Sequence, residues 1–164
     1  MSALIPCAFT TLILTLAATY SVAFPDGAPV DTCVKAKVNQ PNHSRAKPQP
    51  QDKNPYRIIA SDVNYGPGSQ IAVTIEGDTH FKGFFIQARD IETNQWIGEW
   101  EEIPNTKVHP ECSAITHADP EYKQKAVLIW TAPKNSHGGQ VYFTGTVLKN
   151  YKTFWSDMIN LIQA

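Results

Sequence analysis

The chain has 164 residues, which is enough for one globular domain and a short additional segment. Hydrophobic residues make up 42% of the sequence and charged residues 18%, as in ordinary globular proteins. The formal net charge of −1 at pH 7 gives no overall attraction to nucleic acid, so a nucleic-acid partner is not expected.

The first 23 residues have the pattern of a secretory signal peptide, although the usual Lys or Arg near the start is missing. Residues 9–18 form an apolar stretch of h-region length, and residues 21–23 supply the small side chains that signal peptidase requires. An uncleaved membrane anchor is the alternative, because the apolar stretch approaches the ~20 residues that a span needs. Pro6, several Thr residues and the lack of following basic residues favour cleavage. We therefore expect a secreted, extracellular protein without a membrane span after signal cleavage.

Secretion determines how the cysteines are interpreted. Cys7 lies in the predicted signal peptide, and an oxidising compartment is expected to join the remaining Cys33 and Cys112 in a disulfide. The chain-entropy model assigns about 4–5 kcal/mol to a loop of this length. Asn42 begins the sequon Asn-His-Ser, which predicts a glycosylation site at the surface.

Residues 24–55 are predicted to form an extended surface arm that is tied down at Cys33. The stretch from residue 40 to residue 55 contains four prolines, at positions 41, 48, 50 and 55. Because proline fixes φ and lacks a backbone donor, neither a helix nor a central strand can run through it. We define residues 24–55 as the arm and residues 56–164 as the body.

Charge is divided unevenly between the two ends of the mature chain. Residues 24–57 carry six basic and three acidic side chains, a net charge of +3. Residues 58–164 carry eight basic and twelve acidic side chains, a net charge of −4. A basic arm on an acidic body favours anionic partners such as bacterial lipid phosphates. The alternative is that these charges only keep the arm solvated. The candidate anion-binding residues are Lys35, Lys37, Arg45, Lys47, Lys53 and Arg57.

The body has the pattern of an all-β protein. Ile71, Val73 and Ile75 alternate with polar residues, the period of a half-buried strand, and Gly and Pro form a turn at residues 66–68. The predicted strands are residues 56–61, 70–77, 81–90, 96–103, 126–133 and 139–148, and residues 154–164 fit either another strand or a short helix. Strands of this length with turns between them predict an antiparallel β-sandwich of about seven to eight strands.

Aromatic residues lie mostly on these strands and are expected to fill the core. Phe84 and Phe85 are adjacent, so they face opposite sides of their strand. The candidates for an exposed position are Tyr56, Tyr65, Trp96 and Trp100.

The sequence gives no support for catalysis. Ser136 and His137 are neighbours on a Gly-rich loop, where adjacent side chains usually point apart, and no G-x-S-x-G motif is present. We interpret them as a hairpin turn and expect neither catalytic residues nor enzyme activity.

Two loose groups resemble metal sites. His109, Cys112 and His117 fall within nine positions, but Cys112 has a better partner in Cys33. The second group consists of Glu76, Asp78 and His80. We expect neither to hold a metal and expect no cofactor.

Several segments together resemble the reeler (reelin amino-terminal) domain family, and most closely its small secreted insect defence proteins. Each segment is weak alone, but their order and spacing are specific, and they extend over the whole mature chain. The segments are "FPDGAPVDTC" at 24–33, "PNH" at 41–43, "PY" at 55–56, "YGPGSQIAVTIEG" at 65–77, "FKGFFIQARD" at 81–90, Cys112, "ITHAD" at 115–119, "WTAP" at 130–133, "GQVYFTGTV" at 139–147 and "FW" at 154–155. The chain departs from the family in its single cysteine after "DGAP" and in its basic, Pro-rich insert after "PNH".

The resemblance implies an immunoglobulin-like β-sandwich, with residues 24–164 as a single domain and the Cys33–Cys112 disulfide joining the arm to the body. It also implies a non-enzymatic innate-immunity protein that takes part in antibacterial and antifungal responses. The implied partners are microbial envelope components, such as lipopolysaccharide, lipoteichoic acid and β-glucan, and blood cells. The alternative is an extracellular module for host proteins or matrix that does not bind microbes directly.

Overall fold

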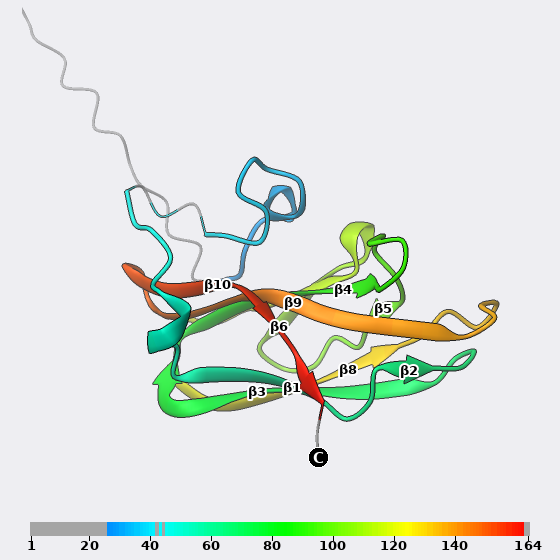
Figure 1. The fold of residues 1–164 in the computed structure, drawn as a ribbon. Coiled ribbons are helices and arrows are strands. Elements are labelled where there is room, and N and C mark those ends of the chain that lie inside the picture. The colour runs from blue at the N-terminus through cyan, green and yellow to red at the C-terminus, as the bar shows by residue number, and fades with distance from the viewer. Residues whose placement is uncertain (1–25, 42, 44, 163–164) are drawn as a thin grey trace, which may run out of the picture.

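The computed structural model describes residues 26–162 except 42 and 44, and in it two β-sheets are stacked face to face (Figure 1). The predicted signal peptide and the predicted glycosylation residue Asn42 therefore lie outside the described residues. One sheet has the strand order β11-β1-β3-β8-β5 and the other β10-β9-β4-β7-β6, and the short β2 pairs with the beginning of β9. The predicted all-β sandwich is confirmed.

The strands differ greatly in length. In the first sheet they are β11 (Leu161–Ile162), β1 (Tyr56–Ala60), β3 (Gln70–Phe81), β8 (Lys123–Thr131) and β5 (Glu99–Trp100). In the second they are β10 (Thr153–Ile159), β9 (Gly139–Asn150), β4 (Gly83–Asp90), β7 (Ala114–His117) and β6 (Thr106–His109), with β2 at Asn64–Tyr65. Within the part of the chain that the structure describes, eight of these have four or more residues, as the sequence predicts. Pairing is antiparallel except between β1 and β11, which run parallel.

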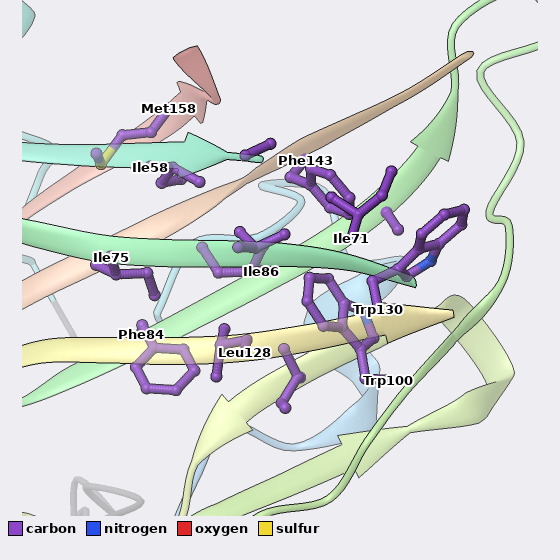
Figure 2. Close-up of a cluster of buried hydrophobic side chains, with 14 of the residues drawn as sticks. Ile58, Ile71, Ile75, Phe84, Ile86, Trp100, Leu128, Trp130, Phe143 and Met158 are labelled. Carbon is purple, nitrogen blue, oxygen red and sulfur yellow. The ribbon is translucent and has the colours of Figure 1, made fainter. Parts of the chain in front are cut away.

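The core lies between the two sheets and follows the period of two. Ile71, Val73 and Ile75 on β3 are fully buried, and Figure 2 shows side chains of β3, β4, β8 and β9 directed toward one another. Trp130 on β8 contacts Phe143 on β9, with ring centroids 5.8 Å apart. The alternating pattern of the sequence thus defines the inner face of the sandwich.

One predicted strand belongs to two sheets. Phe81 ends β3 in the first sheet, Gly83 begins β4 in the second, and Lys82 lies at the crossing. The amide of Lys82 already donates to the carbonyl of Leu148 on β9, at 2.8 Å, so the chain changes its pairing partner at this residue.

Other predicted elements need correction. Of the predicted strand 96–103 only Glu99 and Trp100 are in β5, whereas β6 and β7 were not predicted. Both are four residues long, too short to show a clear period. The tail is a strand, β10, rather than a helix. Among the aromatic residues expected at the surface only Trp96 is exposed, and Tyr56, Tyr65 and Trp100 are buried in the main core.

A second apolar cluster lies on the outer face of the β10-β9-β4-β7-β6 sheet. Phe85, which faces away from the main core, packs there with Cys33, Cys112 and Ala114. Three short 3-10 helices accompany this region and the arm: η1 (Val30–Cys33), η2 (Gln51–Lys53) and η3 (Pro110–Cys112). Figure 1 shows the start of the arm lying outside the sheet that contains β10, β9 and β4. The described residues contain no helix long and apolar enough to cross a membrane.

Candidate ligand-binding site beneath the arm

The arm is fixed to the body by a disulfide and by hydrogen bonds. Cys33 and Cys112 are bonded, with their Cα atoms 6.3 Å apart, which confirms the predicted pair. Nearby, a ring nitrogen of His109 lies 2.8 Å from the carbonyl of Ala28, whose amide donates to the Thr116 hydroxyl. These contacts hold the start of the arm across β6 and β7.

The rest of the arm is attached along β9 and β10. The hydroxyl of Thr146 donates to the carbonyl of Asn39, and the amide of Gln49 donates to the carbonyl of Phe154 at 2.8 Å. The indole of Trp155 donates to the carbonyl of Pro50 at 3.1 Å. The arm is therefore a covering layer of the sheet along much of its length, and it is not a free tail.

A cavity of about 410 Å³ lies between the arm and the sheet. This volume is within the range of small-molecule sites in proteins. The arm provides one wall, through residues 28–41 and 43, and β4, β7 and β9 provide the other. The described lining residues are Ala28, Pro29, Thr32, Asn39, Pro41, His43, Lys82, Gly83, Phe84, Phe85, His117, Pro120, Thr146, Leu148, Asn150 and Tyr151.

Local backbone geometry places the polar groups of the arm wall. Asn39 has φ of 59°, a left-handed conformation that Asn tolerates better than most residues. Its amide donates to the carbonyl of Thr32 at 3.0 Å, and its carbonyl accepts from Thr146. The backbone of Asn39 is thus fully paired, and its amide joins it to Thr32, another lining residue.

Polar atoms without partners are concentrated in this wall. The described chain has four buried side-chain oxygen or nitrogen atoms without a hydrogen bond, and three of them, Thr32 Oγ1, Asn39 Oδ1 and His43 Nδ1, belong to lining residues. A buried polar group left unsatisfied costs about 1–3 kcal/mol. These three atoms are shielded from solvent, so they lie behind the surface of the wall and do not face the open cavity.

Two imidazoles border the cavity, and both favour the neutral form. Burial lowers the pKa of His117, whose Nδ1 lies 3.2 Å from both the amide and the carbonyl of Phe84. Burial also lowers the pKa of His43, whose ring stacks on Tyr151 with centroids 4.2 Å apart. Neither ring brings a positive charge into the cavity at neutral pH.

Protonation of His117 is expected to destabilise the fold. Burial is the largest cause of its lowered pKa and Lys123 acts in the same direction, while the Phe84 backbone, Asp119 and Asp26 oppose them. The unfolded chain therefore binds a proton more readily than the folded one. The stabilisation is complete above the ordinary pKa of about 6.5 and is lost as pH falls through the lower folded value.

Urea unfolding at pH 7.5 and pH 5.5 tests this expectation. Wild-type protein should lose stability between the two pH values, and His117→Gln should lose less. His137→Gln is the matched control, because His137 is exposed on the β8–β9 loop, and it should behave as wild type. An equal decline in His117→Gln would refute the role given to this imidazole.

The predicted anion-binding residues lie at several places in the fold. Lys35 and Lys37 follow η1, Arg45 and Lys47 lie in the middle of the arm, and Lys53 is in η2. Lys37, Arg45, Lys47 and Lys53 are exposed, and none of them makes an ion pair with a described residue.

The two other predicted cations differ from these four. Lys35 is half-buried, and burial lowers its pKa although the charge of Asp31 opposes the change. Arg57 lies on β1 in the opposite sheet and pairs with Glu76 at 3.6 Å. Arg57 is therefore not placed with the arm.

The residues considered as candidates for catalysis or metal binding make structural contacts or lie at the surface. Ser136 donates to the carbonyl of Pro133 at 2.8 Å, as in a turn, and His137 is exposed. Cys112 is in the disulfide, and His109 contacts the arm. No group of three or more His, Cys, Asp or Glu residues within the described ranges could hold a metal ion.

Sequence reasoning did not predict the cavity. Its walls come from residues as far apart as Ala28 and Tyr151, and Thr32 and Asn39 read as ordinary polar residues of a loop. One signal was present: Phe85 must face away from Phe84, so an outward aromatic on a buried strand implies that something covers that face.

The domain is an all-β sandwich of two stacked sheets. Its N-terminal arm lies across the outer face of one sheet and is attached there by a disulfide. Comparison with known families then identifies the domain. The Reeler domain model matches residues 32–162, so the chain belongs to the Reeler domain family.

Similar proteins fall into two groups of different length. The chain is 36% identical over 140 residues to "Putative defense protein 3" of Antheraea mylitta, covering 81% of each protein. It is 30% identical over 153 residues to ferric-chelate reductase 1 of Homo sapiens, covering 88% of this chain. The match spans only 24% of the length of that reductase. Among solved structures, the human F-spondin reeler domain (fragment 2) is similar in fold, with a TM-score of 0.56 at 16% identity over 82% of this chain and 100% of that one.

Proposed function

We propose that this protein is an extracellular, non-enzymatic defence protein whose arm binds anionic components of microbial envelopes. The defence-protein names of relatives with similar length support the class. The Cys33–Cys112 disulfide supports the location, because disulfides persist in oxidising, extracellular compartments.

The observation that carries the proposal is the set of unpaired cations on the arm. Lys37, Arg45, Lys47 and Lys53 are exposed on a segment held outside the sandwich, while the body that bears it has an acidic excess. Exposed cations without internal partners attract polyanions such as lipid phosphates, and ions screen that attraction over about 8–10 Å at physiological salt.

Neutralising part of the arm is expected to weaken binding to lipopolysaccharide and lipoteichoic acid. Each cation near an anionic lipid surface contributes about 1 kcal/mol, so Lys37→Gln with Lys47→Gln should reduce affinity roughly 30-fold. The loss should shrink when the salt concentration is raised. Surface plasmon resonance on immobilised lipopolysaccharide at low and high salt measures both effects.

The matched control is Lys107→Gln with Lys134→Gln. Both lysines are exposed and lie outside the arm, on β6 and in the β8–β9 loop, so the overall charge changes equally. An equal loss in both double variants would show that net charge, not the arm, is responsible. Neutral β-glucan provides a second comparison, because its binding should not depend on these charges. Capture of host haemolymph proteins without any envelope binding would instead support the interaction-module alternative.

A further inference from the structure

Three valines near the start of the arm are exposed to solvent. Val30, Val34 and Val38 are 45%, 69% and 38% exposed. The described residues include ten exposed large apolar side chains, and these three fall within nine consecutive positions. We call residues 30–38 the valine loop. Single exposed apolar side chains are ordinary, whereas several gathered on one short segment indicate a surface that meets a partner.

The shape of the valine loop is fixed at its base. Cys33 is held by the disulfide, and the amide of Asn39 donates to the carbonyl of Thr32 at 3.0 Å. All three of these residues are buried, whereas every residue between Cys33 and Asn39 is exposed except the half-buried Lys35. Figure 1 shows this part of the arm, in blue, standing out from the sheet that contains β9 and β10. The exposure of the valines is therefore a property of the folded arm.

Positive charge lies between the valines. Lys35 and Lys37 fall between Val34 and Val38 in the sequence, and Lys37 is exposed and makes no ion pair with a described residue. Asp31 is the acidic residue of the loop, which leaves it a net charge of +1. A lysine can lay its methylene stem along apolar surroundings while its ammonium group stays in a polar layer. The loop thus presents apolar side chains and a cation on one small projection.

A lipid bilayer fits this projection better than a folded protein does. A stable protein interface takes about 800 Å² and roughly 20–30 residues from each partner, many more than the nine residues of the loop. An anionic bilayer offers phosphates at its surface and acyl chains directly beneath them. Binding there combines the burial of apolar side chains with the attraction of cations to the lipid headgroups.

We propose that the valine loop inserts into the surface layer of anionic lipid bilayers. Val34 and Val38 enter the boundary between headgroups and acyl chains, and Lys37 stays among the lipid phosphates. The proposal rests on the proposed function, because it takes the arm as the part that binds. It adds the lipid membrane as the target and apolar insertion as a second source of affinity.

Replacement of Val34 and Val38 by serine tests the insertion. The double variant keeps every charge, and both sites are exposed, so its melting temperature should equal that of wild type. Its binding to vesicles of phosphatidylglycerol and phosphatidylcholine, measured by co-sedimentation of the secreted full-length protein, should be about tenfold weaker because two valines no longer leave water. The binding that remains should be lost at high salt, whereas wild type should stay partly bound.

The matched control is Val127→Ser with Ile91→Ser. These residues are 45% and 54% exposed and lie outside the arm, so the variant loses a similar amount of exposed apolar surface. It should bind the vesicles as wild type does. An equal loss in both double variants would show that the valine loop has no special part in binding and would overturn the proposal.

A monolayer experiment separates insertion from attraction between charges. Wild-type protein should raise the surface pressure of a phosphatidylglycerol monolayer at constant area, and the valine double variant should not. Both should bind inorganic polyphosphate equally, because it offers negative charge without acyl chains.

Failure of the insertion can be distinguished from failure of the proposed function. If wild type binds lipopolysaccharide and the valine variant binds vesicles equally well, the insertion is wrong and the charge-based function stands. If wild type binds neither lipopolysaccharide nor lipoteichoic acid, the proposed function is wrong and the insertion falls with it. Unchanged vesicle binding with reduced binding to haemolymph proteins would make the loop a protein-docking surface and overturn the proposal.

Discussion

Replacing Cys33 and Cys112 together by alanine is expected to lower the free energy of unfolding by about 4 kcal/mol. The bond closes a loop with a sequence separation of 79, and the chain-entropy model places a loop of that size between about 3 and about 4.7 kcal/mol. Both residues are buried in the outer apolar cluster, where alanine remains compatible and serine would add an unpaired hydroxyl. Denaturant unfolding followed by circular dichroism measures the change.

Reduced wild-type protein is the control for this variant, because it loses the same bond while it keeps both side chains. Its stability should agree with that of the double variant to within about 1 kcal/mol. A double variant that loses less than about 1 kcal/mol would show that the other contacts hold the arm by themselves.

Features with a local cause could be predicted from the sequence. The alternation of Ile71, Val73 and Ile75 is a direct consequence of burying one face of a strand, and β8 and β9 have long apolar runs of the same kind. The disulfide followed from the compartment and from the two cysteines that remain in the mature chain. These features depend on a few neighbouring residues or on simple counting.

Features that depend on tertiary packing could not be predicted. The run from Phe81 to Asp90 shows one uninterrupted strand pattern, and only the choice of pairing partner at Lys82 divides it between two sheets. Tyr65 and Trp100 lie beside polar and turn residues, yet both are buried, Tyr65 against Trp130 and Trp100 against Phe143. A sequence pattern shows the period of a strand but says little about which distant residues pack against it.

Even less of the candidate site than of the fold could be predicted from the sequence. The six predicted anion-binding residues are recognisable by type, but the fold separates Arg57 from the others and pairs it with Glu76. Thr32 and Asn39 are recognisable as lining residues only when the arm is seen to cover a cavity. Position relative to a distant strand, and not residue type, distinguishes them from other loop residues.

Trp130 is expected to be the most sensitive single position of the core. Its side chain is fully buried, its indole donates to the carbonyl of Ile97 at 2.9 Å, and it leaves no room for a side chain at Gly98, which has φ of 70°. Its ring contacts Tyr65 edge-on, at 5.5 Å between centroids. Trp130→Ala should therefore lower the free energy of unfolding by about 4 kcal/mol. It leaves a cavity in the core and removes the donor that hydrogen-bonds to the carbonyl of Ile97.

The control for Trp130→Ala is Trp96→Ala, which removes the same side chain from the surface. Trp96 is 38% exposed and stacks with the guanidinium of Arg89, 5.6 Å from the ring centroid, a contact that contributes about 0.5–1 kcal/mol at exposed sites. Urea unfolding followed by far-UV circular dichroism compares the two variants without relying on tryptophan fluorescence. Similar losses in both would mean that Trp130 does not anchor the two sheets, because burial between them is the property that distinguishes it from Trp96.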